Sequence, residues 1–329
     1  MLIIMLIKIV EIKVGKRDWK EYNEKLKQRG SILLTFDREF FAELYFSGDR
    51  KHGGVRAYSE KMYEYMLTIK VMLKISWRAT EGFCEKLIKH VFPEREVYVP
   101  NHAHAGRTAN KLKLKIKQYL RKDEEPAVIA FDSTGIRVYS SSEWHKRNHK
   151  KDEEKPSKFM DKWKKIHISV DVNSMEIKSV VFTDSNVNDC EVVEEIASQI
   201  DFSVDSVLCD AAYDTSKTRS IIVDKLKAKD IIPPHITSVT QDKGRNKSQR
   251  KEHLKNRDDT INKIRESSDF RTGLKKWKIE SGYHKRSKVE STFSRLKKIF
   301  GFSLQSKNNN SRINEVITKI NILNLMNSL

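Results

Sequence analysis

Two aspartates in this 329-residue chain directly follow apolar runs that are typical of buried strands. Asp132 comes after a run that ends at Phe131, and Asp210 comes after Val207, Leu208 and Cys209. Open α/β sheets bind ligands beyond the carboxyl ends of neighbouring strands. Carboxylates there could hold Mg²⁺, and two such ions about 3.5–4 Å apart can activate water for phosphodiester cleavage. An aspartate after a strand more often caps a turn, so neither position alone identifies a site.

A third carboxylate, Glu290, lies in a stretch with helical spacing. Tyr283 stands seven residues before it, Arg286 four before it and Lys297 seven after it. At about 100° per residue, these four polar side chains share one face of a helix. The adjacent face is apolar and is expected to pack on the sheet, which would turn the carboxylate toward the sheet edge; it comprises Val289, Phe293, Leu296 and Phe300. A surface ion pair between Arg286 and Glu290 would give the same pattern.

Composition favours a nucleic-acid ligand. Lys and Arg number 64 against 45 Asp and Glu, and the formal net charge of +19 predicts binding to a polyanion. The charge is spread along the chain, and the opening apolar run 1–7 is too short to span a membrane, so we expect no membrane partner. Three widely spaced cysteines predict neither a disulfide framework nor a zinc module, and they fit a reducing cytoplasm.

Residues 1–122 are expected to form a mostly helical domain. Helical periodicity begins near Trp19, Tyr58, Ala79 and Pro100, and we expect the last of these helices to continue to Leu120. Its polar side carries basic residues, among them Arg107 and Lys111. Three helices with a basic third one are compatible with a helix-turn-helix DNA reader. The pattern alone favours an ordinary bundle with a solvated lysine face, because the segment 93–100 is longer than the turn of such a motif.

Residues 123–329 are expected to form a mixed α/β sheet with flanking helices, because the pattern changes to short apolar strands after 126. Strands are predicted at 127–131, 136–139, 166–172, 177–182, 204–209 and 231–232, and helices at 190–200, 215–227, 290–300 and 313–325. A basic insertion is predicted at about 236–270. Asp189 is interpreted as the cap of the helix that follows it, and His167 as a structural residue.

The order of motifs resembles a known family. Tyr283, Arg286, Glu290 and Lys297 reproduce the signature of DDE transposases of the IS4/IS5 insertion-sequence superfamily, and residues 277–287 are most similar to the IS903-like group of the IS5 family. The resemblance spans about residues 18–326. Further blocks agree in order at 29–31, 80–83, 132–135, 210–214 and 232–234, whereas the segment 100–107 departs from the family pattern.

The resemblance implies an RNase H-like catalytic domain in which Asp132, Asp210 and Glu290 bind two Mg²⁺ ions, with Mn²⁺ able to substitute. It further implies that the protein cleaves double-stranded DNA at terminal inverted repeats and transfers the 3′-OH strand into target DNA. The active form would be a homodimer or higher oligomer on DNA. Its expected location is the cytoplasm, at the nucleoid. A non-catalytic DNA-binding derivative and an RNase H-like structure-specific nuclease are the alternatives.

The resemblance also implies contacts to DNA. Tyr283, Arg286 and Lys297 would contact the transposon end near the scissile phosphate, where a guanidinium suits bidentate phosphate binding. Arg137 and the basic loop 145–165 would line the DNA channel, and Arg107 and Lys111 would contribute from the N-terminal domain.

Overall fold

The computed structural model describes residues 18–30, 38–45, 58–94, 96–120, 125–138, 163–240 and 251–329. By compactness the chain divides into two units, 1–36 together with Leu329, and 37–328. The first unit contains α1 (Trp19–Gly30), which confirms the helix expected there. Asp18 caps its first turn by accepting hydrogen bonds from the backbone N–H groups of Lys20 and Glu21, at 2.8 and 3.1 Å. No residue of α1 is buried.

The second unit begins with four helices, which are α2 (Arg38–Ala42), α3 (Glu60–Leu73), α4 (Trp77–Val91) and α5 (His102–Ala109). The last three contact one another. Local capping fixes where two of them begin, because the side chains of Ser76 and Asn101 accept hydrogen bonds from the first turns of α4 and α5. Glu81 of α4 ties the two helices together by accepting from the backbone N–H of His102 at 2.8 Å.

The expected continuation of α5 to Leu120 is wrong, because this helix ends at Ala109. Four lysines between 111 and 117 alternate with Leu112, Leu114 and Ile116; the lysines are exposed and the apolar residues are half-buried. A repeat of two is typical of an extended chain and cannot place apolar residues on one helix face. The sequence indicated the basic residues of this segment correctly, but they follow the two-residue spacing of an extended chain and not the spacing of a helix.

The extended segment after α5 is bound by the side chains of the last helix, α12 (Asn309–Ser328). The Asn314 amide donates to the backbone carbonyl groups of Ala109 and Leu112, each at 2.9 Å. Asn321 both donates to the Lys115 carbonyl at 3.0 Å and accepts from the Lys117 N–H at 2.8 Å. Backbone groups that a helix would have paired internally are therefore satisfied by asparagine side chains.

A mixed sheet forms the centre of the second unit, in the strand order β3-β2-β1-β4-β5. β1 pairs antiparallel with β2 and parallel with β4; β2 and β3 are antiparallel, and β4 and β5 are parallel. The strands are β1 (Ala127–Val138), β2 (Trp163–Asp171), β3 (Ile177–Asp184), β4 (Val204–Leu208) and β5 (Lys229–Ile231). The predicted strands 127–131 and 136–139 join into one strand through Val138, and Tyr139 lies outside the described residues.

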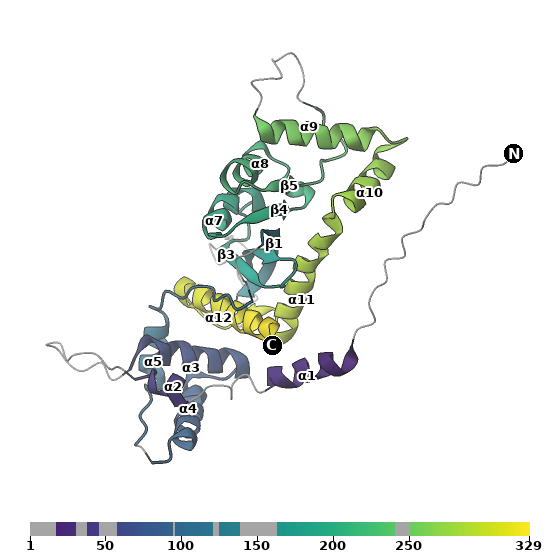
Figure 1. Cartoon of the computed structure of the whole chain (residues 1–329). Coiled ribbons are helices and arrows are strands. Elements are labelled where there is room, and N and C mark those ends of the chain that lie inside the picture. The colour runs from purple at the N-terminus through teal and green to yellow at the C-terminus, as the bar shows by residue number, and fades with distance from the viewer. Residues whose placement is uncertain are drawn as a thin grey trace, which may run out of the picture. The chain divides into compact units, whose positions relative to one another are not determined.

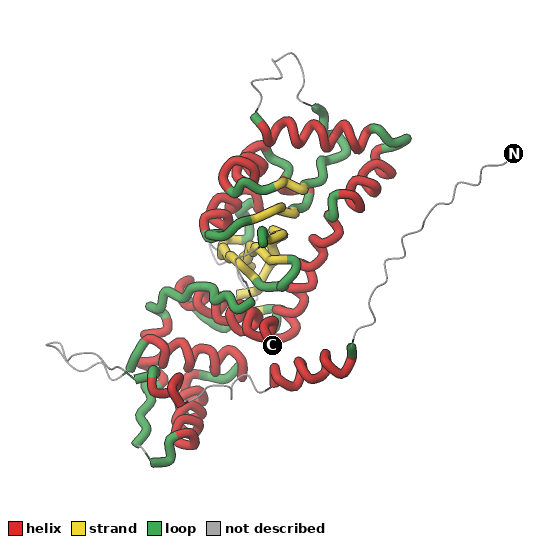
Figure 2. Tube along the Cα trace, in the orientation of Figure 1, coloured by secondary structure: helices red, strands yellow, loops and turns green. Residues whose placement is uncertain are grey.

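Helices flank the sheet on both sides (Figure 2). α7 (Val193–Ser198) and the single helical turn Ile221–Lys225 bury apolar residues against Ile129 and Phe131 of β1. α8 (Ser216–Ser220) precedes that turn. α11 (Ser287–Phe300) contacts β1 and β2, and the short strand β6 (Ser303–Leu304) pairs with the far end of β1.

The predicted basic insertion at about 236–270 contains a helix, α9 (Glu252–Arg265), and α10 (Phe270–Glu280) follows it. Residues 241–250 lie outside the described part. The two helices pack on each other so closely that a Cβ at Gly273 would stand 1.9 Å from the carbonyl oxygen of Ile264. Their charge-rich sequences gave little apolar periodicity, so neither helix was predicted.

Within the second unit, α12 lies between the sheet and the helices α3–α5 (Figure 1). It contacts α3, α11 and β3, and most of its residues are buried. Asn324 extends the edge of the sheet, because its side chain accepts from the Ile177 N–H and donates to the Ile177 carbonyl, both at 2.9 Å. Among the described helices, none is both long and apolar enough to cross a membrane.

Candidate active site

Asp132 lies within β1, not after it, and its position is open because the neighbouring strand is shorter. β4 pairs with β1 only as far as Ala130, which stands opposite Leu208, the last residue of β4. Asp132 is therefore two residues beyond the last pair on one strand, and Asp210 is two residues beyond it on the other. Parallel strands bring these two aspartates to the same edge of the sheet.

Asp210 occupies the turn that follows β4. Its carboxylate accepts a hydrogen bond from the Ala212 N–H at 2.9 Å and so caps the short 3₁₀ helix η2 (Ala211–Tyr213). One oxygen of the carboxylate thus orients the group, as expected for an aspartate after a strand. The capping role and a place at the sheet edge are compatible.

Glu290 projects from the first turn of α11. The apolar face predicted for this helix is buried, as shown by Val289, Phe293 and Leu296, while the Glu290 side chain is 58% exposed. The hydrophobic face therefore fixes the helix against the sheet and leaves the carboxylate accessible to solvent. The sequence reasoning about this face is confirmed.

Arg286, at the end of η5 (Tyr283–Arg286), connects the two sides of the site. Its guanidinium donates from Nη1 to Asp132 Oδ2 at 3.1 Å and from Nη2 to Glu290 Oε1 at 2.5 Å. The i,i+4 ion pair that the sequence allowed is present, and it extends to a strand 154 residues away. A fork of N–H donors suits such a bridge, which a lysine could not reproduce.

The carboxylates also act on one another electrostatically. Burial raises the pKa of the Asp132 carboxyl, and the negative charges of Asp210 and Glu290 raise it further, whereas the Ser133 N–H and Arg286 oppose them. Mutual repulsion of this kind favours a bound cation. Within the described residues, however, no group of three Asp, Glu, His or Cys side chains stands close enough together to enclose a metal ion, and Arg286 lies where the carboxylates meet.

Tyr283 and Lys297 border this cluster. The Arg286 guanidinium carbon lies 5.9 Å from the centre of the Tyr283 ring, which also packs against Trp277 at 5.9 Å. Burial raises the pKa of the Tyr283 hydroxyl, and the charge of Asp210 adds to that effect. Lys297 donates to the Thr134 hydroxyl at 2.5 Å and contacts neither Asp132 nor Glu290.

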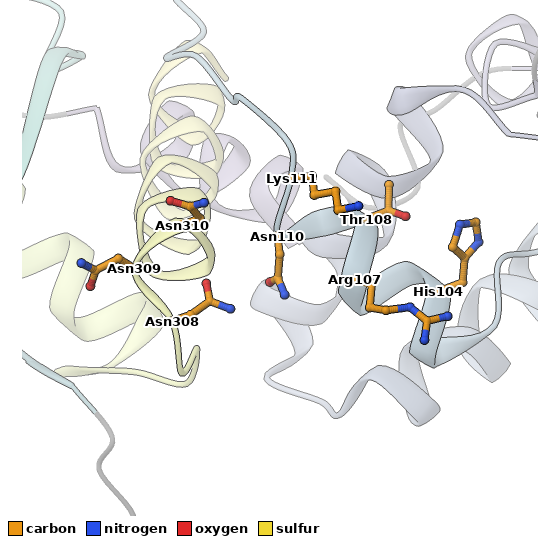
Figure 3. Close-up of a pocket in the computed structure, with 8 residues that line it drawn as sticks. All are labelled: His104, Arg107, Thr108, Asn110, Lys111, Asn308, Asn309 and Asn310. Atoms are coloured by element: carbon orange, nitrogen blue, oxygen red, sulfur yellow. The ribbon is translucent and has the colours of Figure 1, made fainter.

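The other basic residues predicted from sequence lie elsewhere. Arg137 is on β1 five residues beyond Asp132, where it pairs with Trp163 of β2. Arg107 and Lys111 line a pocket together with residues at the start of α12, as Figure 3 shows. Most of the predicted basic loop 145–165 falls outside the described residues.

One polar cluster beside the site was missed. Asp189 is the first residue of the turn η1 (Asp189–Val192), but its side chain does not cap that turn, contrary to the prediction. It accepts instead from the Ser133 hydroxyl at 2.9 Å and from Lys165 Nζ at 3.1 Å, and His167 Nδ1 stands 3.5 Å away. Burial lowers the pKa of His167 to about 4. The alternation of Lys165 and His167 on one strand face was the available signal.

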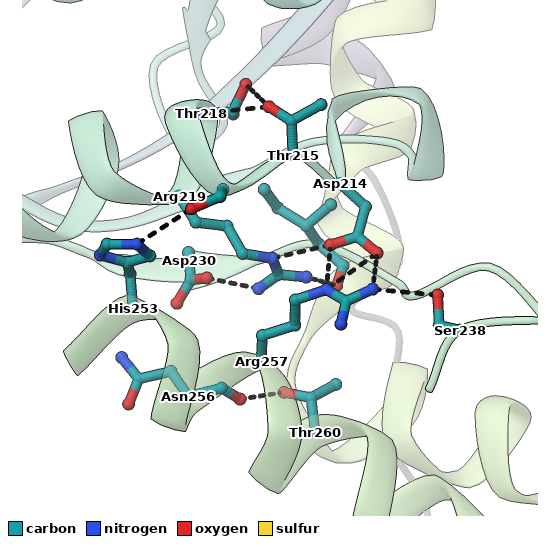
Figure 4. A network of polar contacts seen from close by, with 12 residues as sticks. Asp214, Thr215, Thr218, Arg219, Asp230, Ser238, His253, Asn256, Arg257 and Thr260 are labelled. Atoms are coloured by element: carbon teal, nitrogen blue, oxygen red, sulfur yellow. Dashed lines mark hydrogen bonds and ion pairs between the residues drawn. The ribbon is translucent and has the colours of Figure 1, made fainter. Parts of the chain in front are cut away.

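A second missed cluster surrounds Asp214 (Figure 4). Arg219 is completely buried; it donates to Asp214 Oδ1 at 2.8 Å, to Asp230, and to the Ile232 carbonyl at 2.9 Å. Arg257 of α9 donates to both oxygens of Asp214. The Asp214 carboxylate, four residues after Asp210, is thereby bound from two helices.

The structure thus brings Asp132 and Glu290 to one arginine at the edge of a mixed α/β sheet, and carboxylates are the ligands that hard divalent cations take. Family models described as a transposase DDE domain match residues 123–325 and residues 27–141. The first match covers more than half of the chain, so this protein belongs to the transposase DDE family and is a DDE transposase. Among solved structures, the Drosophila P element transposase strand transfer complex is similar at 11% identity and a TM-score of 0.29, over 92% of this chain and 70% of that chain.

Proposed function

We propose that this transposase serves an insertion sequence of the IS5 family, in its IS903-like group, and that it cleaves DNA at terminal inverted repeats and joins the released 3′-OH end to target DNA. The observation that carries the proposal is the convergence of Asp132 and Glu290 on Arg286, with Asp210 beside them. Arg286 and Glu290 belong to the family signature, and Asp132 and Asp210 lie in two further blocks of the sequence that resemble the family.

The proposed catalytic domain is RNase H-like. Three antiparallel strands followed by two parallel ones, in the order β3-β2-β1-β4-β5, support this assignment. Carboxylates on the central strand, after β4 and on α11 then stand in the order expected for such a domain. The three-helix group α3–α5 that precedes it is the proposed DNA-binding region.

Asp132, Asp210 and Glu290 would hold divalent cations, Mg²⁺ or Mn²⁺, because carboxylate oxygens are the ligands that hard cations take. Bound there, a pair of such ions would supply a nucleophile at neutral pH and stabilise the leaving oxygen. For the carboxylates to close on a cation, Arg286 must give up its contacts with Asp132 and Glu290. Its guanidinium would then be free for a phosphate, for which it has the same bidentate geometry.

The reaction has two steps that use the same residues. In the first, a water oxygen bonds to phosphorus at the transposon end and the bond to the 3′ oxygen breaks, which leaves a 3′-OH. In the second, that 3′-OH bonds to a target phosphorus and displaces a 3′ oxygen of the target strand. Arg286, Lys297, Tyr283 and Arg137 would position the DNA backbone; Arg107 and Lys111 would bind it elsewhere. Inverted repeats come in pairs, which supports a homodimer or higher oligomer on DNA.

The test is cleavage of a labelled duplex that carries the element's terminal repeat, with Mg²⁺ or Mn²⁺. Wild type should release 3′-OH ends and joined products, and Asp132→Ala, Asp210→Ala and Glu290→Ala should abolish both. Asp205→Ala is the matched control, because it removes an exposed carboxylate of β4 and should leave cleavage unchanged. Binding without any cleavage by wild type would favour a DNA-binding derivative, and cleavage without joining would favour a structure-specific nuclease.

A further inference from the structure

The turn η1 contacts both of the segments that carry Asp132 and Asp210. The ladder between β1 and β4 ends at the pair Ala130–Leu208, so both aspartates lie beyond the backbone pairing that sets the distance between these two strands. η1 packs against η2, the 3₁₀ turn that follows Asp210. Side chains of η1 are thus available to connect the two segments where the ladder has ended.

Asp189, the first residue of η1, reaches the segment of Asp132. Its Oδ1 accepts from the Ser133 hydroxyl at 2.9 Å, and the Ser133 N–H donates to Asp132 Oδ1 at 2.8 Å. Successive side chains of a strand point to opposite faces, so Asp189 approaches β1 from the face opposite to the Asp132 carboxylate. Ser133 therefore connects the two carboxylates by two hydrogen bonds, although they lie on different sides of the strand.

Cys190, the next residue of η1, reaches the segment of Asp210 in the same way. Its thiol donates to the Ala212 carbonyl at 2.9 Å, and the Ala212 N–H donates to Asp210 Oδ1 at 2.9 Å. In both aspartates the backbone N–H binds Oδ1 and does not use Oδ2. Two adjacent residues of one turn are therefore each linked, through a single intermediate residue, to one of the two aspartates.

η1 is itself held in place by core packing and by an ion pair. Val192 of η1 and Val193 directly after it are buried in the apolar core. Lys165 of β2 donates to Asp189 Oδ1 at 3.1 Å and to the Val187 carbonyl at 3.0 Å, which fixes the chain on the other side of Asp189. A functional group is held precisely only when the residues that support it are themselves fixed, and η1 meets this condition.

We propose that Asp189 and Cys190 are positioning residues that set the separation and orientation of the Asp132 and Asp210 carboxylates. The inference rests on the proposed function, because it takes these two aspartates to be ligands of a divalent cation. Hydrogen bonds that orient metal ligands typically change metal affinity or activity by about 10–100-fold when they are removed. The competing account is that the cluster only stabilises the fold, in which case metal affinity would not depend on it.

The test is isothermal titration calorimetry of the full chain with Mn²⁺ in the absence of DNA, beside urea unfolding of each variant. Ser133→Ala removes the hydroxyl that links Asp189 to Asp132 but keeps the ion pair between Asp189 and Lys165, and it should weaken Mn²⁺ binding about tenfold. Ser133→Thr keeps a hydroxyl at this position and should restore the wild-type affinity. A role in stability alone would lower the urea midpoint and leave Mn²⁺ affinity unchanged.

The contribution of Cys190 is tested by a second pair of variants. Cys190→Ala should weaken Mn²⁺ binding about threefold, less than Ser133→Ala, because a thiol is a weak donor. Cys190→Ser keeps a donor for the Ala212 carbonyl and should restore the wild-type affinity. Glu191→Ala is the matched control, since it removes from the same turn a carboxylate whose partner is Asn188, and it should leave Mn²⁺ affinity unchanged.

Asp189→Ala and Ser133→Ala remove the same hydrogen bond, so the double variant should lose no more Mn²⁺ affinity than Asp189→Ala alone. Additive losses, wild-type affinity in Ser133→Ala, or an equal loss in Glu191→Ala would overturn the proposal. If wild type binds Mn²⁺ but never cleaves DNA, and the variants still bind Mn²⁺ more weakly, the proposed function fails and this inference stands. If wild type cleaves and every variant binds Mn²⁺ equally well, only this inference fails, and a wild type that binds no Mn²⁺ would overturn both.

Discussion

Two arginines of this transposase each bridge two carboxylates, but in different surroundings. Arg219 is 0% exposed, and its partners Asp214 and Asp230 are 6% and 3% exposed. Arg286 is 18% exposed, and of its partners Asp132 is 17% and Glu290 is 58% exposed. The same pairing of charges thus occurs once in the interior and once at the surface.

This difference in solvent exposure distinguishes an ion-pair cluster that stabilises the fold from one that is accessible to a ligand. Inside the protein, no water can replace the partner of a buried charge. Removing one member of the Arg219 cluster would therefore leave an uncompensated buried charge and destabilise the fold. At the edge of the sheet, water, a metal ion or a phosphate can take over each contact that Arg286 makes. Residue types alone do not distinguish the two clusters; solvent access does.

The largest effect is expected from breaking the buried cluster. Arg219→Ala leaves Asp230 buried without a cation and should lower the free energy of unfolding by about 3–5 kcal/mol. Arg286→Ala, which removes the same side chain from the half-exposed cluster, should lower it by less than about 1 kcal/mol. Urea unfolding followed by circular dichroism compares the two, and equal losses would show that the distinction between the clusters is false.

A smaller effect is expected from acidification, through His167. Burial lowers its pKa to about 4, below the unfolded value of about 6.5, so the unfolded chain takes up a proton that the folded chain does not. Stability is therefore full above about pH 6.5 and falls between there and pH 4, by about 2 kcal/mol from pH 7.5 to 5. His167→Gln should flatten this part of the urea-midpoint profile. An unchanged profile would mean that the pKa of His167 is the same in the folded and the unfolded chain.

The smallest effect is expected on metal affinity, when Arg286 is removed from the partly exposed cluster. Without Arg286, a divalent cation no longer competes for Asp132 and Glu290, so Arg286→Ala should tighten Mn²⁺ binding in the absence of DNA by about tenfold, equivalent to about 1.4 kcal/mol. Isothermal titration calorimetry measures this directly. Lys297→Ala is the control, since Lys297 contacts neither carboxylate, and should leave Mn²⁺ affinity unchanged. Weaker binding in Arg286→Ala would show that the arginine supports the metal site instead of competing for it.

Local sequence signals predicted much of the sheet. The place of Asp210 after β4 and the apolar face of α11 depend on neighbours within one strand or one turn, and both predictions are confirmed, whereas Asp132, expected after a strand, lies within β1. Arg286 was seen as a partner of Glu290, because that pair is one helical turn apart, but its contact with Asp132 joins residues 154 positions apart. Only the assembled sheet brings that pair together.

Two of the errors share one cause, which is that distant side chains decided the local structure. The segment after α5 carries enough lysine and leucine to be helical, yet asparagines of α12 bind its backbone in an extended form. Asp189 could cap its own helix, yet its carboxylate accepts hydrogen bonds from Ser133 and Lys165 instead. Tertiary contacts overrode local propensity in both places.

The position of α12 in the sequence determines the order in which parts of the chain can fold during translation. This helix binds the backbone of both the segment after α5 and the edge strand β3, yet it is translated after every element that it holds. While the ribosome is still adding these residues, the nascent chain has its three carboxylates but not the helix that joins the sheet to the N-terminal region. The extended form of the segment after α5, and the bonds that α12 makes to the edge of the sheet, can therefore form only after α12 has been translated.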